Sequence, residues 1–389
     1  MCNSPKIQQM LLWIFSALLH TYVAWRLLPP LQYVSSSLQM VIAAVIVLSA
    51  LMVPLGIVGR RFSRKGVAHA LTWMGLIFMG WLSSLFVLTL ARDVLSLLIG
   101  LGQLGFPGHW EMESLRTFDV WSAIVVWVLG SVITLMGFVN ARRTAQVVTV
   151  DVPIAELPEA LHGFTIAQIS DIHVGPTIKK PYLTAIVDAV NRLGADMVAI
   201  TGDLVDGSVH ELAEHVAPLR NLVSRHGSYF VTGNHEYYSG ASHWIVELRR
   251  LGVKVLLNEH VVLSHDEARL VVAGVTDYSA HHFDPAQRSD PGLAIAHAPA
   301  SVLRILLAHQ PRSAIAAANA GYHLQLSGHT HGGQFLPWSY FVKFQQPFTA
   351  GLHRLHNLWV YTSRGTGYWG PPKRFGAPSE ITCLRLVQA

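Results

Sequence analysis

The chain has 389 residues, of which 51% are hydrophobic and only 13% are charged. Soluble proteins carry about 25% charged residues, so this composition excludes an ordinary soluble protein. The formal net charge is +5, and the basic residues lie mainly beside apolar segments, which indicates membrane orientation and argues against a nucleic-acid partner. The two cysteines, Cys2 and Cys383, lie at opposite ends of the chain, so we expect neither a disulfide framework nor a cysteine-based metal cluster.

The N-terminal third contains four apolar stretches, each with about the 20 residues needed to cross a bilayer. They are Met10–Leu28, Leu38–Val58, Ala68–Leu90 and Val120–Val139. None contains an acidic residue, and the single basic one, Arg26, lies near an end, where its side chain reaches the interface. Two alternatives are buried helices of a soluble bundle and a cleaved signal peptide, but the first stretch lacks a small-residue cleavage site. We therefore predict an integral, multi-pass protein of a bacterial inner or plasma membrane, with the lipid bilayer as its partner.

The orientation of these spans depends on a fifth stretch, Val94–Gly105, which is shorter and which we expect to be interfacial or re-entrant. With four spans, both ends of the membrane unit lie on one side, and that side carries more basic residues. The richer side has Lys6, Arg60, Arg61, Arg64, Lys65, Arg142 and Arg143, and the other has Arg26, Arg92 and Arg116. The positive-inside rule then places the C-terminal domain in the cytoplasm, whereas a crossing by the fifth stretch would reverse this.

From about Val148 the composition becomes that of a globular domain, in which strand-like and helix-like runs alternate. This alternation predicts a central sheet, parallel in part, with helices outside it. Helices are predicted over Pro181–Leu193, Glu211–Arg225 and His243–Leu251. Strands are predicted over Phe164–Ser170, Met197–Thr201, Ser228–Thr232, Val253–Leu257, Leu270–Val275, Val302–Ala308, Leu324–Ser327, Leu358–Thr362 and Glu380–Val387.

Polar side chains follow five of these strands, at the point where each strand ends. Ligand sites of open α/β sheets lie at the carboxyl ends of strands, so we expect these side chains to converge on one rim. Aspartate, asparagine and histidine without thiolate suit Mn²⁺, Fe or Zn²⁺, and the set is too large for one tetrahedral ion. It fits two ions that share a carboxylate, an arrangement typical of phosphoester hydrolysis. The segments are Asp171-Ile172-His173, Gly202-Asp203, Gly233-Asn234-His235-Glu236, His309 and Gly328-His329-Thr330-His331.

Several of these residues also have a structural interpretation when each is taken alone. Asp203 fits an ordinary helix N-cap, Asn234 fits a turn, and His309 fits a loop histidine that is satisfied by hydrogen bonds. What favours a site is that residues of these types follow five predicted strands of the same domain. Three nearby residues are candidates for supporting the ligands, namely Asp206, Glu236 and His243.

Together, the five segments resemble the complete motif series of the calcineurin-like metallophosphoesterases, in the order of that family and with no departure from it. The later segments Ser363-Arg364-Gly365, Arg374-Phe375-Gly376 and Glu380-Ile381-Thr382 are similar to its membrane-anchored, multi-span branch. The resemblance implies an α/β fold, a four-layer-type sandwich of mixed β-sheets flanked by helices, preceded here by an all-α transmembrane helical unit. The predicted domains are therefore a transmembrane helical domain, 1–147, and a metallophosphoesterase domain, 148–389.

The resemblance also implies a role for each motif residue. One divalent ion would be held by Asp171, His173 and His331, and the other by Asn234, His309 and His329, with Asp203 bridging them. The catalytic residue would be His235, which would donate a proton to the leaving oxygen or stabilise charge at the phosphoryl group. Outside the motifs, Arg364 either binds a substrate phosphate or supports its own loop. The metals are open among Mn, Fe and Zn.

These expectations predict a binuclear-metal-dependent phosphohydrolase that cleaves a phosphoester or pyrophosphate bond by attack of a metal-activated hydroxide. Because the short linker Asn140–Thr149 joins the spans to the domain, we expect a lipid-linked or membrane-proximal phosphorylated substrate. An alternative is a catalytically weak membrane interaction or regulatory module that retains the phosphoesterase fold. The full ligand set and the presence of His235 argue against that alternative. A transporter with a regulatory domain fits less well, since the predicted spans lack buried ionisable residues.

Overall fold

The computed structural model describes residues 5–59, 65–105, 111–299 and 302–389, and the chain divides into two compact units. The helical unit comprises Met1–Val139 together with Gly370–Lys373, and the C-terminal unit comprises Asn140–Trp369 and Arg374–Ala389. Among the basic residues that set the expected orientation, Arg60, Arg61 and Arg64 lie outside the described residues, as does Cys2.

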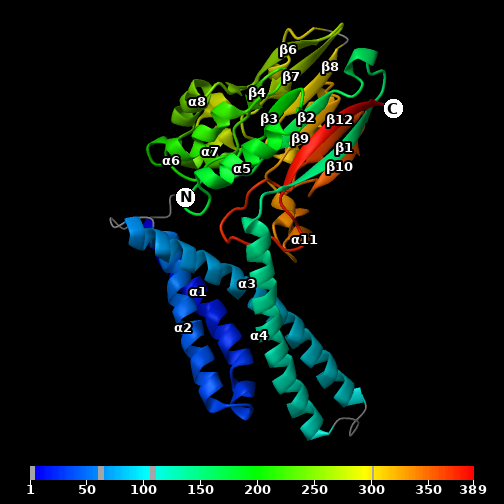
Figure 1. The fold of residues 1–389 in the computed structure, drawn as a ribbon. Coiled ribbons are helices and arrows are strands. Elements are labelled where there is room, and N and C mark those ends of the chain that lie inside the picture. The colour runs from blue at the N-terminus through cyan, green and yellow to red at the C-terminus, as the bar shows by residue number, and fades with distance from the viewer. Residues whose placement is uncertain (1–4, 60–64, 106–110, 300–301) are drawn as a thin grey trace. The chain divides into compact units, whose positions relative to one another are not determined.

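Four long helices form the helical unit (Figure 1). Each forms where the sequence has its apolar run, and each is long and apolar enough to cross a membrane. Between the first two helices lies the short 3-10 helix η1 (Pro29–Tyr33). The four long helices are α1 (Pro5–Leu27), α2 (Ser36–Val58), α3 (Lys65–Gly105) and α4 (Met112–Arg142).

The fifth apolar stretch, Val94–Gly105, was expected to be a separate interfacial or re-entrant segment. In the structure it instead continues α3 without a break. Arg92 and Asp93, which precede this stretch, do not end the helix, because both side chains form ion pairs with other helices of the unit. The Arg92 guanidinium pairs with Asp119 of α4. Asp93 forms an ion pair with Arg26 of α1, in which a guanidinium nitrogen lies 2.8 Å from the Asp93 Oδ1 atom. These ion pairs offset the cost of placing charged side chains among apolar helices.

Two six-stranded sheets, both of mixed direction, form the C-terminal unit (Figure 1). The first sheet has the order β1 (Gln146–Ile154), β12 (Glu380–Gln388), β2 (Thr165–Ile169), β3 (Met197–Ile200), β4 (Ser228–Phe230) and β5 (Lys254–Val255). The second has the order β10 (Gly351–Leu355), β11 (Leu358–Thr362), β9 (Leu324–Ser327), β8 (Leu303–Leu307), β7 (Ala268–Gly274) and β6 (Glu259–His265). Strands β2 to β5 are parallel in the first sheet, and β11, β9, β8 and β7 are parallel in the second.

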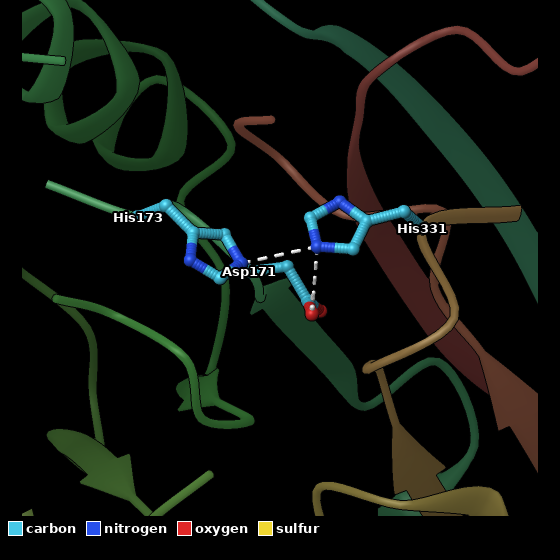
Figure 2. Close-up of side chains that lie close together, drawn as sticks. All are labelled: Asp171, His173 and His331. Carbon is cyan, nitrogen blue, oxygen red and sulfur yellow. Dashed lines mark hydrogen bonds and ion pairs between the residues drawn. The ribbon is translucent and has the colours of Figure 1, made fainter. Parts of the chain in front are cut away.

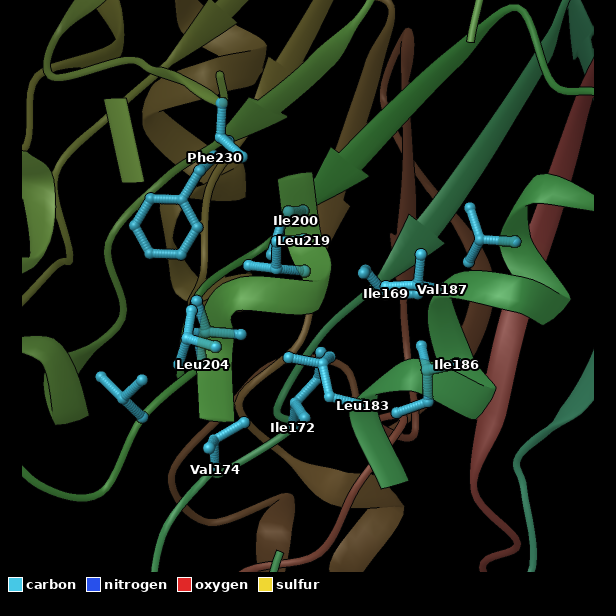
Figure 3. Close-up of a cluster of buried hydrophobic side chains, with 14 of the residues drawn as sticks. Ile169, Ile172, Val174, Leu183, Ile186, Val187, Ile200, Leu204, Leu219 and Phe230 are labelled. Carbon is cyan, nitrogen blue, oxygen red and sulfur yellow. The ribbon is translucent and has the colours of Figure 1, made fainter. Parts of the chain in front are cut away.

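Three buried clusters of apolar side chains hold these sheets and the helices around them together. Residues from both sheets, such as Ile166 and Val272, form the cluster between the sheets. On the outer face of the first sheet, Leu183 and Ile186 of α5 pack against Ile169 and other sheet residues (Figure 3). A third cluster covers the outer face of the second sheet. The order helices, sheet, sheet, helices confirms the predicted four-layer sandwich, and the simpler expectation of one central sheet was incomplete.

Short helices connect the strands of this sandwich. The α-helices are α5 (Lys180–Asn191), α6 (Val209–Val216), α7 (Asn234–Ser239), α8 (Ala241–Arg250), α9 (Pro291–Ala294), α10 (Ala314–Asn319) and α11 (Ser339–Val342). The 3-10 turns are η3 (Glu159–Leu161), η4 (Ala217–Asn221), η5 (Ala280–His282), η6 (Pro285–Gln287), η7 (Pro311–Ser313) and η8 (His331–Gly333). The single helix predicted over Glu211–Arg225 was wrong, because the α-helix ends at Val216 and η4 follows with Pro218 in its first turn.

Candidate functional site

The two sheets bring five polar loops to one edge of the sandwich. Asp171, Asp203 and Asn234 follow β2, β3 and β4 of the first sheet, while His309 and His329 follow β8 and β9 of the second. These are the carboxyl ends of parallel strands, where ligand sites of α/β sheets form. The sheets are linked directly behind the site, because the Gln168 side-chain amide donates to the Ser327 carbonyl at 2.9 Å.

Five residues of this edge have a positive φ, which side chains other than glycine rarely adopt. They are Asp171 (53°), His173 (55°), Asp203 (50°), His329 (71°) and His331 (51°). Such a backbone costs on the order of 1–3 kcal/mol per residue and persists where the surrounding structure holds it in place. Strain concentrated on five neighbouring polar residues is characteristic of a functional site.

Glycines allow the loops of this edge to approach one another closely. A Cβ atom on Gly328 would collide with the Ser170 hydroxyl and with the Asp171 carboxylate. A Cβ atom on Gly233 would collide with the carboxylate of Asp203. Glycine is therefore required at both positions for the loops to close around the two carboxylates.

One group of possible ligands consists of Asp171, His173 and His331 (Figure 2). The Nε2 atoms of the two histidines lie 3.0 Å apart, and the His331 Nε2 atom lies 3.4 Å from the Asp171 Oδ1 atom. All three side chains are buried. Asp171 is held in place by the Ser170 hydroxyl, which donates to it at 2.6 Å, and by the His329 backbone amide at 3.0 Å. Two imidazoles and a carboxylate that converge in this way could hold a divalent cation.

A second group consists of Asp203, His309 and His329. The His309 Nε2 atom lies 3.1 Å from the Asp203 Oδ2 atom and 3.2 Å from the His329 Nδ1 atom. The other ring nitrogen of His309, Nδ1, lies 2.7 Å from the Thr201 carbonyl oxygen, which fixes the ring. The Asp203 Oδ2 atom also lies 3.9 Å from the His173 Nε2 atom of the first group. Its carboxylate therefore adjoins both groups.

Asn234 adds a neutral oxygen to this edge. Its Oδ1 atom is buried and has no hydrogen-bond partner among the described residues. An orphaned buried carbonyl oxygen is unfavourable unless a cation or another donor satisfies it. This orphaned atom indicates that the donor set fits a bound cation.

The state of protonation differs among the candidate histidine ligands. Burial opposes charge on both Asp203 and His309, yet their contact lowers the pKa of Asp203 well below its usual range and raises the pKa of His309 well above it. Burial lowers the pKa of His329 to about 3 and, with the charge of Arg374, lowers the pKa of His331 well below its usual range. His329 and His331 are therefore neutral, which is the form in which an imidazole binds metal, whereas His309 has to release its proton before it can bind.

His235 lies beside both groups, and its Nδ1 atom is 2.6 Å from the Asp206 Oδ1 atom. Its backbone amide donates to Asp203 at 2.9 Å, and its ring Nε2 atom lies 4.0 Å from the same carboxylate. Burial disfavours the charged ring, but the hydrogen bond that the ring donates to Asp206 and the charge of Asp203 raise the pKa of His235 to about 9. The ring is partly exposed and carries a proton at neutral pH, so it can act as an acid.

Two of the three residues that we expected to support the ligands do so. Besides Asp206, the buried Glu236 accepts backbone amides of Gly233, Asp203 and Leu204 at 2.6, 3.0 and 2.8 Å, which ties the β3 loop to the β4 loop. His243 is exposed on α8 and belongs to neither ligand group.

Arg364, our candidate for phosphate binding, donates to the buried carboxylate of Glu380 at 2.7 Å. Its backbone amide donates to the same carboxylate at 3.0 Å, so in this structure it supports its loop.

Arg374 lies in a segment noted for its resemblance to the membrane-anchored branch, but it was assigned no role, and it is fully buried behind His331. Its guanidinium donates to the carbonyl of His331 at 2.9 Å and lies 3.1 Å from the ring Nδ1 atom of that residue. It also donates to the carbonyls of Arg364 and Gly367. A possible signal was the position of this arginine directly after Pro-Pro-Lys in an otherwise apolar, glycine-rich loop.

Sequence similarities to known proteins agree with this geometry. The calcineurin-like phosphoesterase family model matches residues 164–333. A transmembrane protein with metallophosphoesterase domain from Danio rerio is 35% identical over 325 residues, which cover 82% of this chain and 74% of that protein. A metallophosphoesterase from Helicobacter pylori, described as uncharacterized, is 36% identical over 327 residues, covering 78% and 83%. A solved 5′-nucleotidase precursor from Thermus thermophilus has a TM-score of 0.38 at 14% identity, covering 58% of this chain and 54% of that one. The chain therefore belongs to the calcineurin-like metallophosphoesterases and, with its four apolar helices, to the members that carry transmembrane helices.

Proposed function

We propose that this chain is a multi-pass membrane phosphohydrolase that uses two divalent ions to cleave a phosphoester or pyrophosphate bond. The observation that carries the proposal is the pair of ligand groups that share Asp203, with the polarised His235 beside them. Two-ion sites with a shared carboxylate suit the displacement of a leaving group at phosphorus.

In this proposal, seven residues hold the two ions. Asp171, His173 and His331 hold one, and Asn234, His309 and His329 hold the other, while Asp203 contacts both. Two bound ions would supply an activated water and neutralise charge on the phosphoryl oxygens. The nitrogen and oxygen donors, without thiolate, suit Mn²⁺, Fe or Zn²⁺.

In this proposal, His235 donates the proton to the leaving group and Asp206 orients His235. With its Nδ1 atom on Asp206, His235 presents Nε2 as the atom that donates a proton to the departing oxygen. The Asp206 carboxylate fixes the direction of the ring and stabilises its charged form. Its pKa lies below the usual range, since the attraction of His173 and His235 outweighs the effect of burial, so it remains ionised.

We further propose that the substrate is lipid-linked or lies at the membrane surface, and that the domain faces the cytoplasm. The support for the substrate class is the fusion of the domain to four apolar helices. The support for the orientation is the excess of basic residues on the domain side.

The test is hydrolysis by the purified full-length chain in lipid nanodiscs, first stripped of metal and then supplied with Mn²⁺, Fe²⁺ or Zn²⁺. Phosphate release is measured from a monoester, a diester and a lipid pyrophosphate. We expect release to require added metal and to be lost in Asp203→Asn but kept in Asp188→Asn, which changes an exposed aspartate of α5. Metal-independent release, or no release from any of the three substrates with any metal, would overturn the proposal.

A further inference from the structure

The segment that follows the candidate ligand His331 carries a run of exposed apolar side chains, mostly aromatic. We call this surface the aromatic rim, and its residues are Leu336, Trp338, Tyr340, Phe341, Phe344 and Trp369. Phe344 is 84% exposed and Tyr340 is 67% exposed. The rings of Trp338, Phe341 and Phe344 are spaced three residues apart and lie in a row, with centroids 5.7 and 6.2 Å apart. A gathering of this kind marks a surface that is built to be covered.

The aromatic rim is joined to the candidate site by hydrogen bonds and a ring contact. The Gln334 side chain and the Trp369 backbone exchange two hydrogen bonds of 2.8 Å. The Trp369 ring packs edge-on against His235, with centroids 5.8 Å apart. At the far end of the segment, the Thr330 hydroxyl donates to the Thr349 carbonyl at 2.6 Å. The rim is therefore fixed to the loop that carries His329 and His331.

The chain itself indicates what covers this surface. Helix α4 ends at Arg142 and β1 begins at Gln146, so the linker can span at most about 14 Å when fully extended. The chain also returns to the helical unit directly after Trp369, where Lys373 of the Gly370–Lys373 segment donates to the Gly80 carbonyl of α3 at 2.9 Å. Both connections tether the C-terminal unit to helices that we expect to cross the bilayer.

The composition of the rim also matches a membrane interface. Tryptophan, tyrosine and phenylalanine settle at the boundary between headgroups and acyl chains. The exposed Lys343, between Phe341 and Phe344, can reach anionic headgroups.

We propose that the aromatic rim inserts into the headgroup boundary of the bilayer that holds the helices of this same chain. Its side chains would enter by about 5–10 Å, the depth of an interfacial segment. Because Trp369 contacts His235, the rim would bring the candidate site to the level of lipid headgroups. The insertion rests on membrane anchoring and not on the proposed hydrolysis, so either can fail without the other.

The test places an environment-sensitive NBD probe on single cysteines in the full-length chain, reconstituted in phosphatidylcholine–phosphatidylglycerol vesicles. Cys2 and Cys383 are first replaced by serine. The probe is attached at Phe344→Cys or Tyr340→Cys, and the matched control is Val223→Cys, which is 67% exposed and precedes the amino end of β4. Emission is then compared with and without lipids brominated near the headgroup.

We expect the probes at 344 and 340 to emit at shorter wavelength than the probe at 223, with brominated lipids quenching them several-fold more strongly. Measuring two rim positions protects the test against one variant that fails to fold. Quenching at both positions that is no stronger than at 223 would overturn the proposal. A blue shift without lipid quenching would overturn it too, because the rim would then be covered by protein.

Discussion

The Oδ1 atom of Asp206 lies 2.6 Å from Nδ1 of His235 and 3.2 Å from Nδ1 of His173. One carboxylate oxygen therefore orients both the expected proton donor and an expected metal ligand. The orientation matters because each imidazole has only two nitrogens. With Nδ1 occupied by Asp206, each ring directs Nε2 toward the site, where one would donate a proton and the other would bind metal.

Replacing His235 with asparagine should slow the chemical step without releasing metal. Positioned acid catalysis contributes roughly 10²–10⁴-fold in rate, so we expect a fall in kcat of about that size on an alkyl phosphate ester. The loss should be smaller on a nitrophenyl ester, because nitrophenolate departs without a proton. The measurements are kcat on both substrates and metal content. His243→Asn, at an exposed histidine of α8, is the matched control and should leave all three unchanged.

Equal losses on the two esters would indicate that His235 stabilises phosphoryl charge instead of donating a proton. Loss of metal from the variant, or an unchanged kcat on both esters, would contradict its assigned role.

Replacing Asp206 with asparagine should lower the pKa of His235. In the ion-free protein, burial lowers this pKa, whereas Asp206 and Asp203 together raise it to about 9. Removing one carboxylate leaves burial less opposed, so the ring should lose its proton at a lower pH than in the parent. NMR titration of the metal-free protein measures the shift directly. In the metal-loaded protein, the alkaline limb of the kcat profile should move to lower pH, because the acid form is lost as pH rises through the pKa.

A His235 titration that stays at its original midpoint in Asp206→Asn would show that Asp206 does not raise this pKa.

How far the sequence predicts this protein depends on how local each signal is. The strands β2, β3, β4, β9 and β11 were predicted almost to the residue, because short apolar runs end at glycine and polar residues. β6 and β10 were missed, since both lie at sheet edges and contain polar residues such as His260 and Arg354, so hydrophobic alternation is weak there. The strand β1 was missed because it lies on a half-exposed edge directly after a predicted span.

The candidate site divides in the same way. Each residue expected to bind metal lies on a loop after a strand, and those loops converge as expected for parallel strands. The role of Arg374 depends on contacts across more than forty positions of sequence, with His331, and no local pattern reports such a contact. The pairing of Arg364 with Glu380 likewise follows from the tertiary path of the chain.

Asp203→Asn should release most of the bound metal while the fold is kept. Asp203 adjoins both ligand groups, at 3.1 Å from His309 and 3.9 Å from His173, so loss of its charge weakens both positions. Elemental analysis of the purified full-length chain measures the metal content, and a thermal unfolding curve reports the fold. Asp188→Asn is again the control. Two ions at full occupancy in Asp203→Asn would contradict the bridging role.

The C-terminal unit should lie in the cytoplasm, because its side of the membrane carries the larger number of basic residues. The continuation of α3 through Val94–Gly105 fits four spans, with both ends of the helical unit on one side. In a cysteine-free background, a membrane-impermeant thiol reagent added to intact cells should label Val34→Cys, beyond the end of α1. It should label Val223→Cys only after the cells are opened. Labelling of position 223 in intact cells would show that the C-terminal unit lies outside the cytoplasm.

Arg374→Lys should lower metal affinity through His331. The arginine is fully buried, and its fork holds the His331 carbonyl, the Arg364 carbonyl and the Gly367 carbonyl at once. Lysine is a single point donor that cannot reproduce this geometry, although it keeps a positive charge. Loss of a residue that orients a ligand typically costs about 10–100-fold in metal affinity, and we expect a loss in that range, measured by calorimetric titration of the metal-free chain. The control is Arg385→Lys, which changes an exposed arginine paired with Asp151 at 2.8 Å and should keep full affinity. Unchanged affinity in a folded Arg374→Lys chain would show that His331 keeps its orientation without the guanidinium.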